Sequence, residues 1–236
     1  MPTTILKTLT AAGLGARRIV AQAVKDGRVC LNGQLVTSFS HIVTSKDKIT
    51  FDGKPLKPPV EKPVYLLLNK PMGVLSTTCD MRGRQTIIDL VPAKYCVPGL
   101  HPVGRLDLES RGLILLTNDG ELTHRLTHPR FEKEKEYMVE LIRTLMPIDK
   151  TRFEQGLELE DGPTHPTRIV QVALKPPLYR ITLHEGRKRQ IRRMFQSLGY
   201  AVRDLKRTRL GSLRLGTLKE GEVRELADNE VRALCN

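Results

Sequence analysis

Apolar runs that end in turn residues dominate the sequence after residue 63. Each run has the length of a strand, and they lie at 64–68, 113–117, 136–141 and 178–183. Helical spacing of apolar residues predicts three helices, at 120–127, 148–156 and 187–198. Because strands and helices mix without a regular strand–helix–strand repeat, the pattern predicts an α+β domain on a mainly antiparallel mixed sheet.

The first 53 residues show a different pattern of shorter elements. Apolar residues at helical spacing predict helices at 3–12 and 16–26, and Gly27 is a stop signal for the second. Residues 28–36 predict a hairpin, because Asn32-Gly33 tolerates the positive φ angles of a tight turn. A further strand is expected at 48–51, so this part is a small α+β module.

A proline-rich segment separates the two patterns. Residues 54–63 contain four prolines, which fix φ and remove amide donors, so a semi-rigid linker is expected. We therefore predict a small domain that includes the start of the linker at 1–60 and a larger domain at 61–236.

Composition narrows the class of protein. Hydrophobic residues make up 39% of the 236 residues and charged residues 28%, which is typical of a globular chain. Since no apolar run reaches about 18 residues, a membrane span is excluded. Four scattered cysteines without a CxxC pair indicate reduced thiols in a cytoplasmic protein. The acid-free first 25 residues leave an organellar transit peptide as an alternative.

The net charge of +13 is concentrated at the two ends of the chain. Residues 1–60 carry 9 lysines and arginines against 3 acids, and residues 179–236 carry 14 against 7. The segment between them is balanced. Two cationic regions around a neutral body predict two contacts on one long anion, most simply a nucleic acid.

One candidate for chemistry is the segment 101–112, directly before an apolar strand. Asp107 lies between Arg105 and Arg111, which would stabilise its charge, and flanking glycines allow a close turn. The alternative is a structural role, in which Asp107 caps a turn or pairs with one of the arginines.

A second candidate is the basic cluster that precedes and enters the helix expected at 187–198. Five of the seven residues at 187–193 are basic. On a helix Arg189, Arg192 and Arg193 share one face, and with Arg187 they predict contact with phosphates or carboxylates. A solvated basic face is the alternative.

Other patterns are weaker. Tyr137 is a candidate for base stacking, but the default from the residues alone is a tyrosine in the core or in a cross-strand contact. His124 and His128 have the spacing of metal ligands but lack a third ligand nearby, so no metal site is expected. Asp107 and Glu109 would share one face of an extended segment, which leaves a carboxylate glycosidase as a remote alternative.

Taken together, these segments resemble the RNA pseudouridine synthases, in the branch that modifies bacterial ribosomal RNA (RsuA/RluB-like). The segments that carry the resemblance follow in family order: 69–73 (NKPMG), 104–107 (GRLD) with 112–120 (GLILLTNDG), 135–137 (KEY), 159–163 (LEDGP) and 185–193 (EGRKRQIRR). Residues 4–52 resemble the α-L RNA-binding module of this branch. Two departures are Ser110, where the family usually has threonine, and Ala16, where the module often has a capping serine.

The resemblance implies isomerisation of uridine to pseudouridine without a cofactor or a metal. The family's essential aspartate falls on Asp107, the expected nucleophile, and direct attack on the sugar and removal of a ribose proton both stay open. Arg192 is expected to pair with Asp107, and Tyr137 to stack on the base and take part in proton transfer. Ile191 would pack on the ring, and Arg105 would fill the space left by the extruded uridine.

The resemblance also implies the partner. The expected substrate is ribosomal RNA or a ribosomal assembly intermediate, bound by a monomer. In the module, the basic residues that would hold the RNA backbone are Arg17, Arg18, Lys25 and Arg28. Residues 159–163 favour large-subunit 23S RNA over small-subunit 16S RNA, and a non-catalytic ribosome-assembly factor on the same fold is the rival function.

Overall fold

The structure is a computed structural model that describes residues 3–15, 17–44, 46–56 and 63–235. Its N-terminal module has two helices, α1 (Ile5–Ala11) and α2 (Arg17–Lys25). Its strands are β1 (Thr3–Thr4), β2 (Val29–Leu31), β3 (Gln34–Leu35), β4 (Ile42–Val43), β5 (Ile49–Phe51) and β6 (Lys54–Pro55). Four of them form a sheet in the order β3-β2-β5-β6, and a separate hydrophobic cluster from Ile5 to Leu56 forms the core of the module.

The tight turn predicted in this module is confirmed. Asn32 and Gly33 have φ angles of 52° and 84°, and they join β2 to β3 in an antiparallel pair. Gly27 ends α2 with a φ of 69°, as a glycine after a helix does.

Two predicted boundaries in the module need correction. The first helix begins at Ile5 and not at residue 3, because β1 pairs with β4 and uses Thr4 as the helix cap. The predicted linker begins too early, because β6 extends the sheet by pairing with β5. Residues 57–62 of that linker and Ala16 lie outside the described residues.

In the part of the chain from residue 63 onward, nine strands form one mixed sheet whose main path is β13-β14-β10-β15-β9-β7-β17. The strands on this path are β7 (Tyr65–Lys70), β9 (Arg111–Thr117), β10 (Lys135–Leu141), β13 (Arg168–Ala173), β14 (Leu178–Leu183), β15 (Val202–Leu210) and β17 (Val223–Glu225). Two short strands flank it, β8 (His101–Pro102) and β16 (Leu213–Arg214). The hairpin β11 (Glu158–Leu159) and β12 (Gly162–Pro163) stands apart. The predicted α+β class and mainly antiparallel sheet are confirmed.

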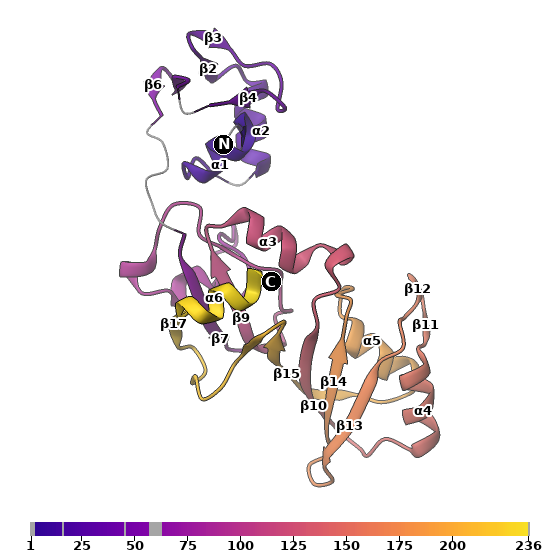
Figure 1. Ribbon diagram of the computed structural model, residues 1–236. Coiled ribbons are helices and arrows are strands. Elements are labelled where there is room, and N and C mark those ends of the chain that lie inside the picture. The colour runs from indigo at the N-terminus through magenta and orange to yellow at the C-terminus, as the bar shows by residue number, and fades with distance from the viewer. Residues whose placement is uncertain (1–2, 16, 45, 57–62, 236) are drawn as a thin grey trace.

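Two sets of helices pack on different halves of the sheet (Figure 1). Helices α4 (Pro147–Gln155) and α5 (Gln190–Ser197) pack on the half made by β10, β13, β14 and β15. Helices α3 (Gly120–Thr127) and α6 (Asp228–Cys235) pack on the half that contains β7 and β9. The opposite face of β7 and β9 is covered by the segment 74–106, which includes the short 3-10 helices Ile88–Leu90 and Ala93–Tyr95. Another 3-10 helix, Pro129–Phe131, follows α3.

A short parallel contact joins the two halves. Strand β15 pairs with β9 at only two positions, Lys206 with Arg111 and Arg207 with Gly112. The backbones approach closely here, since a Cβ on Gly112 would lie 2.3 Å from the carbonyl oxygen of Arg207. Gly112 also has a φ of 105°, so two independent constraints require glycine at this position.

The predictions for this part are confirmed for the apolar elements and wrong at one helix start. Helix α5 begins at Gln190 and not at residue 187, because Arg189 adopts a left-handed conformation with a φ of 50°. Strand β15, nine residues long, is absent from the sequence prediction because charged residues occupy most of it.

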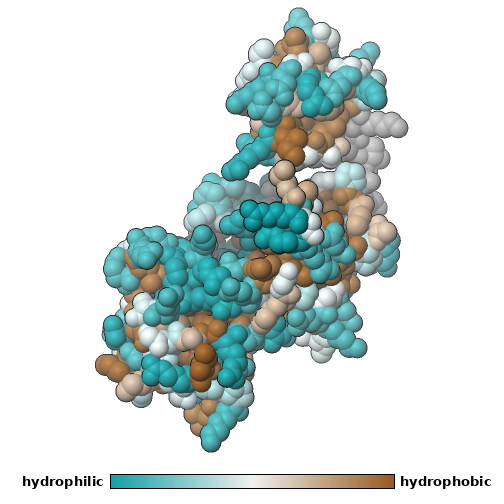
Figure 2. Space-filling model, turned by 180° about the vertical axis from the view of Figure 1, so that it is seen from behind, coloured by the Kyte–Doolittle hydropathy of each residue, from teal (hydrophilic) through white to brown (hydrophobic). Residues whose placement is uncertain are grey.

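The N-terminal module stands out as a separate lobe above the larger domain (Figure 2). One contact between them involves Gly13, where a Cβ would lie 2.6 Å from the Cβ of Pro98. Gly99 lies beside the carbonyl oxygen of Thr10 in the same contact. The module therefore touches the loop before β8, a few residues upstream of Asp107.

Candidate active site

The segment that follows β7 forms a cradle for the Asp107 loop. Gly73 donates a backbone hydrogen bond of 2.9 Å to the carbonyl oxygen of Leu108. The hydroxyl of Ser76 donates to the carbonyl oxygen of Leu106 and accepts from its amide, at 2.8 and 3.1 Å. The loop is thus fixed on both sides of Asp107 by main-chain contacts.

Lys70 also holds the Asp107 loop, through its buried ammonium group. Its side chain is fully buried, and its ammonium group donates to the carbonyl oxygens of Pro71 and Ser110 at 2.8 Å and of Asp107 at 3.4 Å. Burial lowers the pKa of Lys70 to about 8, and the negative charges of Asp107 and Glu220 oppose that shift. One buried cation therefore binds three carbonyl groups around the loop.

Asp107 itself is half-buried and lines a pocket of about 760 Å³. Among the described residues, none forms a hydrogen bond or ion pair with its carboxylate. Arg105, Tyr137 and Ile191 line the same pocket, so the structure brings together four of the five residues expected at the active site. Arg105 is exposed, whereas Ile191 is buried.

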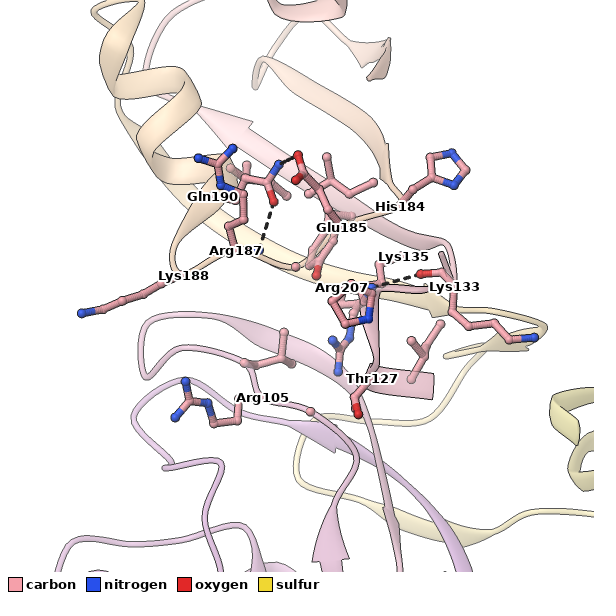
Figure 3. A pocket seen from close by; sticks show the side chains of 18 of the residues that line it. Arg105, Thr127, Lys133, Lys135, His184, Glu185, Arg187, Lys188, Gln190 and Arg207 are labelled. Carbon is pink, nitrogen blue, oxygen red and sulfur yellow. Dashed lines mark hydrogen bonds between the residues drawn. The ribbon is translucent and has the colours of Figure 1, made fainter. Parts of the chain in front are cut away.

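The pocket is strongly positive. Eight lysines and arginines line it against three carboxylates. The cations are Arg105, Arg130, Lys133, Lys135, Arg187, Lys188, Arg189 and Arg207. Figure 3 shows several of them arranged around the opening from strands and loops on both sides. Such a lining is suited to a polyanionic substrate.

The fifth expected residue, Arg192, does not make the contact that the sequence suggested. Its guanidinium donates to the carbonyl oxygens of Glu109 and Val202 at 3.0 and 3.2 Å. Its Nε lies 3.7 Å from a carboxylate oxygen of Glu109. The expected ion pair with Asp107 is therefore wrong in this structure, because Glu109 binds Arg192 through both its main chain and its side chain.

The other arginine expected to stabilise Asp107 is also engaged elsewhere. Arg111 pairs with Asp204 at 2.7 Å and with Glu220 at 3.4 Å. Both carboxylates raise the pKa of Arg111, so its charge stabilises them and not Asp107.

Carboxylates already bind the basic cluster around the start of α5. Asp161, in the β11–β12 turn, pairs with Arg187 and with Arg193, the second at 2.8 Å. These two hydrogen-bonding arginines hold the pKa of Asp161 far below its usual range. Arg189 pairs with Glu109 at 2.7 Å. The expected shared face of three arginines is wrong, because Arg189 precedes the helix.

The module presents basic residues at its surface. Arg17, Arg18 and Lys25 are exposed on α2. Arg28 lies 4.6 Å from the ring centre of Phe51 and forms an ion pair with Asp52. Unlike the three cations of α2, it is therefore already neutralised by a carboxylate within the described residues.

Two residues of the site escaped the sequence analysis. Lys70 ends an apolar strand, a position that indicates a buried charge, whereas the family resemblance through residues 69–73 implies no role for it. Arg207 is also buried, and it lines the pocket beside Lys135. No local signal marks Arg207, since it is one of four cations in β15.

The alternative sites have little support in the described ranges. His124 and His128 pack their rings 4.8 Å apart and against Phe131. No group of three potential metal-binding side chains occurs in the described part of the chain. Nor does any helix there have the length and apolar character needed to cross a membrane.

Comparison with known proteins identifies the family. Residues 64–197 match the family described as RNA pseudouridylate synthase, and residues 4–49 match the S4 domain. The chain belongs to the RNA pseudouridylate synthase family. It is therefore an isomerase, and an S4 domain precedes its synthase domain.

Individual members of the family are similar over nearly the whole chain. Ribosomal large subunit pseudouridine synthase B of Bacillus subtilis (strain 168) is 39% identical over 97% of this chain and 93% of its own. Ribosomal small subunit pseudouridine synthase A of Yersinia pestis is 35% identical over 93% and 92%. A crystal structure of a pseudouridylate synthase matches with a TM-score of 0.72 and 31% identity, covering 98% of this chain and 99% of the other.

Proposed function

We propose that this synthase converts a uridine of ribosomal RNA to pseudouridine, and that the RNA belongs to the large subunit. The single observation that carries the activity is the carboxylate of Asp107, which lines a cationic pocket without a partner among the described side chains. A nucleophile needs such a free carboxylate, and a structural aspartate would be paired.

The pocket residues divide the work. Asp107 acts on the ribose of the extruded uridine, and Tyr137 stacks on its base while Ile191 packs on the ring. Arg105, exposed at the rim, fills the space that the uridine leaves in the RNA. Extruding a base costs a few kcal/mol, which phosphate contacts with the surrounding cations offset.

Arg192 is expected to act in the bound state. It lies on the first turn of α5, next to Ile191, and its partner Glu109 is two residues from Asp107. Displacement of Glu109 by RNA would free Arg192 to approach Asp107. The contact suggested by the family resemblance is thus proposed only for the complex.

The S4 domain supports the choice of RNA as partner, through the exposed cations of α2. The identity of 39% with a large-subunit enzyme, against 35% with a small-subunit enzyme, supports the choice of subunit. Mapping pseudouridines in both ribosomal RNAs from a strain that lacks the gene tests it, since a missing modification in 16S RNA would contradict the proposal.

The decisive variant is Asp107→Asn, which keeps the shape of the side chain and removes its charge. We expect no pseudouridine from it and an RNA affinity within about twofold of the wild type, because phosphate contacts dominate binding. Glu225→Gln, at an exposed position of β17 outside the pocket lining, is the matched control and keeps product formation. Absence of product from the wild type on every ribosomal RNA tested would leave an assembly factor as the function, and release of free base would indicate a glycosidase.

A further inference from the structure

A buried guanidinium lies at the floor of the pocket. Arg207 is only 3% exposed, and its Nε donates a 2.7 Å hydrogen bond to the carbonyl oxygen of Leu113. Its Nη2 atom is buried without a hydrogen-bond partner, and no carboxylate in the described ranges forms an ion pair with it. Since guanidinium has five N–H donors and a buried charge is costly without a partner, this group is poised for an acceptor from outside the chain.

A second cation lies beside the first. The ammonium group of Lys135 donates a hydrogen bond of 3.0 Å to the carbonyl oxygen of Lys133 and lies under the loop at Gly186, where a Cβ would come 3.9 Å from it. Burial lowers the pKa of Lys135, the positive charge of Arg207 lowers it further, and Glu185 opposes the shift. Figure 3 shows Lys135 and Arg207 close together in the middle of the lining. Two positive charges that lie close together favour an electronegative group between them.

The surroundings of these cations indicate a base and not a phosphate. Arg207 is the direct cross-strand partner of Tyr137, and both line the pocket. Buried Leu205 and Ile191 provide apolar walls nearby. A flat ring with polar edges suits an aromatic and apolar slot, whereas a hydrated phosphate suits the exposed cations at the rim, such as Lys188 and Arg189.

We propose that Arg207, with Lys135 beside it, binds the carbonyl oxygens of the target uracil and stabilises the negative charge of the detached ring. The inference rests on the proposed function. When the bond between C1′ and N1 breaks, its electron pair stays on the ring and spreads over N1, O2 and O4. The bond from C5 to C1′ then forms, the proton on C5 is lost and N1 gains one, so the isomerisation balances. Hydrogen-bond donors that are already in place stabilise the charge that develops in the transition state, and this lowers the barrier.

The test compares two leaving groups in single-turnover reactions with ribosomal RNA fragments. One fragment carries uridine at the target position, and the other carries 5-fluorouridine, whose ring accepts negative charge more readily. Because its C5 carries fluorine and has no proton to lose, the reaction of 5-fluorouridine stops after the C5–C1′ bond has formed, so both rates are measured as consumption of the starting nucleoside. Lys135→Met keeps the length of the side chain and removes its charge. In Lys135→Met we expect the rate with uridine to fall at least tenfold. The fold-loss with 5-fluorouridine should be at least three times smaller. The dissociation constant for the RNA should stay unchanged. Arg207→Lys keeps the positive charge and loses the forked N–H donors of the guanidinium group. Its rate with uridine should therefore fall only in part.

The matched control is Lys206→Met, since Lys206 precedes Arg207 in β15, points to the opposite face and does not line the pocket. It should leave both rates unchanged. Equal losses for the two substrates in Lys135→Met, or a weaker RNA affinity with an unchanged rate, would overturn the inference. If Arg207→Lys fails to fold, the comparison of the two substrates in Lys135→Met is sufficient to test the inference. A wild-type enzyme that forms no pseudouridine contradicts the proposed function, whereas an active wild type with fully active variants contradicts only the role of these cations.

Discussion

The ammonium group of Lys70 donates a hydrogen bond of 2.8 Å to the carbonyl oxygen of Ser110, forty positions later in the chain. The same group reaches the carbonyl oxygen of Asp107. A strand end and the candidate nucleophile loop are therefore joined by one buried charge, which explains why a lysine occurs in an otherwise apolar stretch.

Removing this lysine is expected to change the response of stability to pH. The pKa of Lys70 is about 8 in the folded chain, against about 10.4 in the unfolded one, so the unfolded state binds more protons between these values. The free energy of unfolding then rises with pH across this window, by up to about 3 kcal/mol from this group. Urea titrations at pH 7.5 and 10.5 should show that rise in the wild type and a smaller one in Lys70→Met.

Lys70→Met should also impair catalysis, because the carbonyl groups around Asp107 lose their shared donor. A small displacement of a reacting group costs about 100-fold in unfavourable cases, and we expect at least a tenfold lower single-turnover rate. RNA affinity should stay the same, as measured by filter binding. Full activity in a folded Lys70→Met enzyme would show that the loop is held by Gly73 and Ser76 alone.

Asp161→Asn is expected to strengthen RNA binding and steepen its salt dependence. The substitution releases Arg187 and Arg193 from their carboxylate, which leaves two more cations for phosphates. Each added contact with single-stranded RNA changes the slope of log K against log salt by about 0.7. Binding measured between 50 and 300 mM salt checks this, and an unchanged slope would place both arginines outside the RNA interface.

The same variant has a predicted effect at acid pH. Because the pKa of Asp161 is lowered in the folded chain, its contribution to stability is present above the unfolded pKa of about 3.9 and is lost as the pH falls below it. The difference in melting temperature between wild type and Asp161→Asn should therefore be largest near neutral pH and shrink toward pH 2. A difference in melting temperature that does not change with pH would mean that the β11–β12 hairpin is stabilised by packing and not by the charge of Asp161.

Loss of the N-terminal module should weaken RNA binding and reduce its salt dependence. Deletion of residues 1–60 removes up to nine cations, and the hydrophobic clusters of the larger domain are separate from that of the module. The double variant Arg17→Gln with Arg18→Gln is a milder test on the intact chain. An unchanged slope in both would show that the module does not touch RNA.

The sequence predicts the parts of the fold whose local pattern is strong. The apolar runs at 64–68 and 113–117 become β7 and β9, and Asn32-Gly33 forms the expected turn. Strand β15 could not be predicted because it is rich in charges, some of which are paired across the sheet, for example Arg203 with Glu140. Cross-strand partners, which local periodicity does not contain, make such a strand stable.

The same distinction holds for the candidate site. The flanking arginines and glycines make Asp107 a candidate, but its role as nucleophile, like the roles of Tyr137 and Ile191, follows from the family resemblance. The binding of Arg192 to Glu109 in this structure could not be predicted, because Glu109 lies only two residues from Asp107 and side-chain direction decides between them. The burial of Arg207 depends on the pairing of β15 with two distant strands, so only the folded chain reveals it.

The contact between Gly112 and Arg207 has a consequence for the size of the target that fits. Asp107 and Tyr137 belong to opposite halves of the sheet, and these halves meet where the two backbones touch. A methyl group at position 112 would wedge the halves apart and carry the nucleophile away from the stacking ring. The separation of Asp107 from Tyr137, and with it the width available to the flipped nucleoside, therefore depends on a backbone contact that only a glycine at position 112 allows.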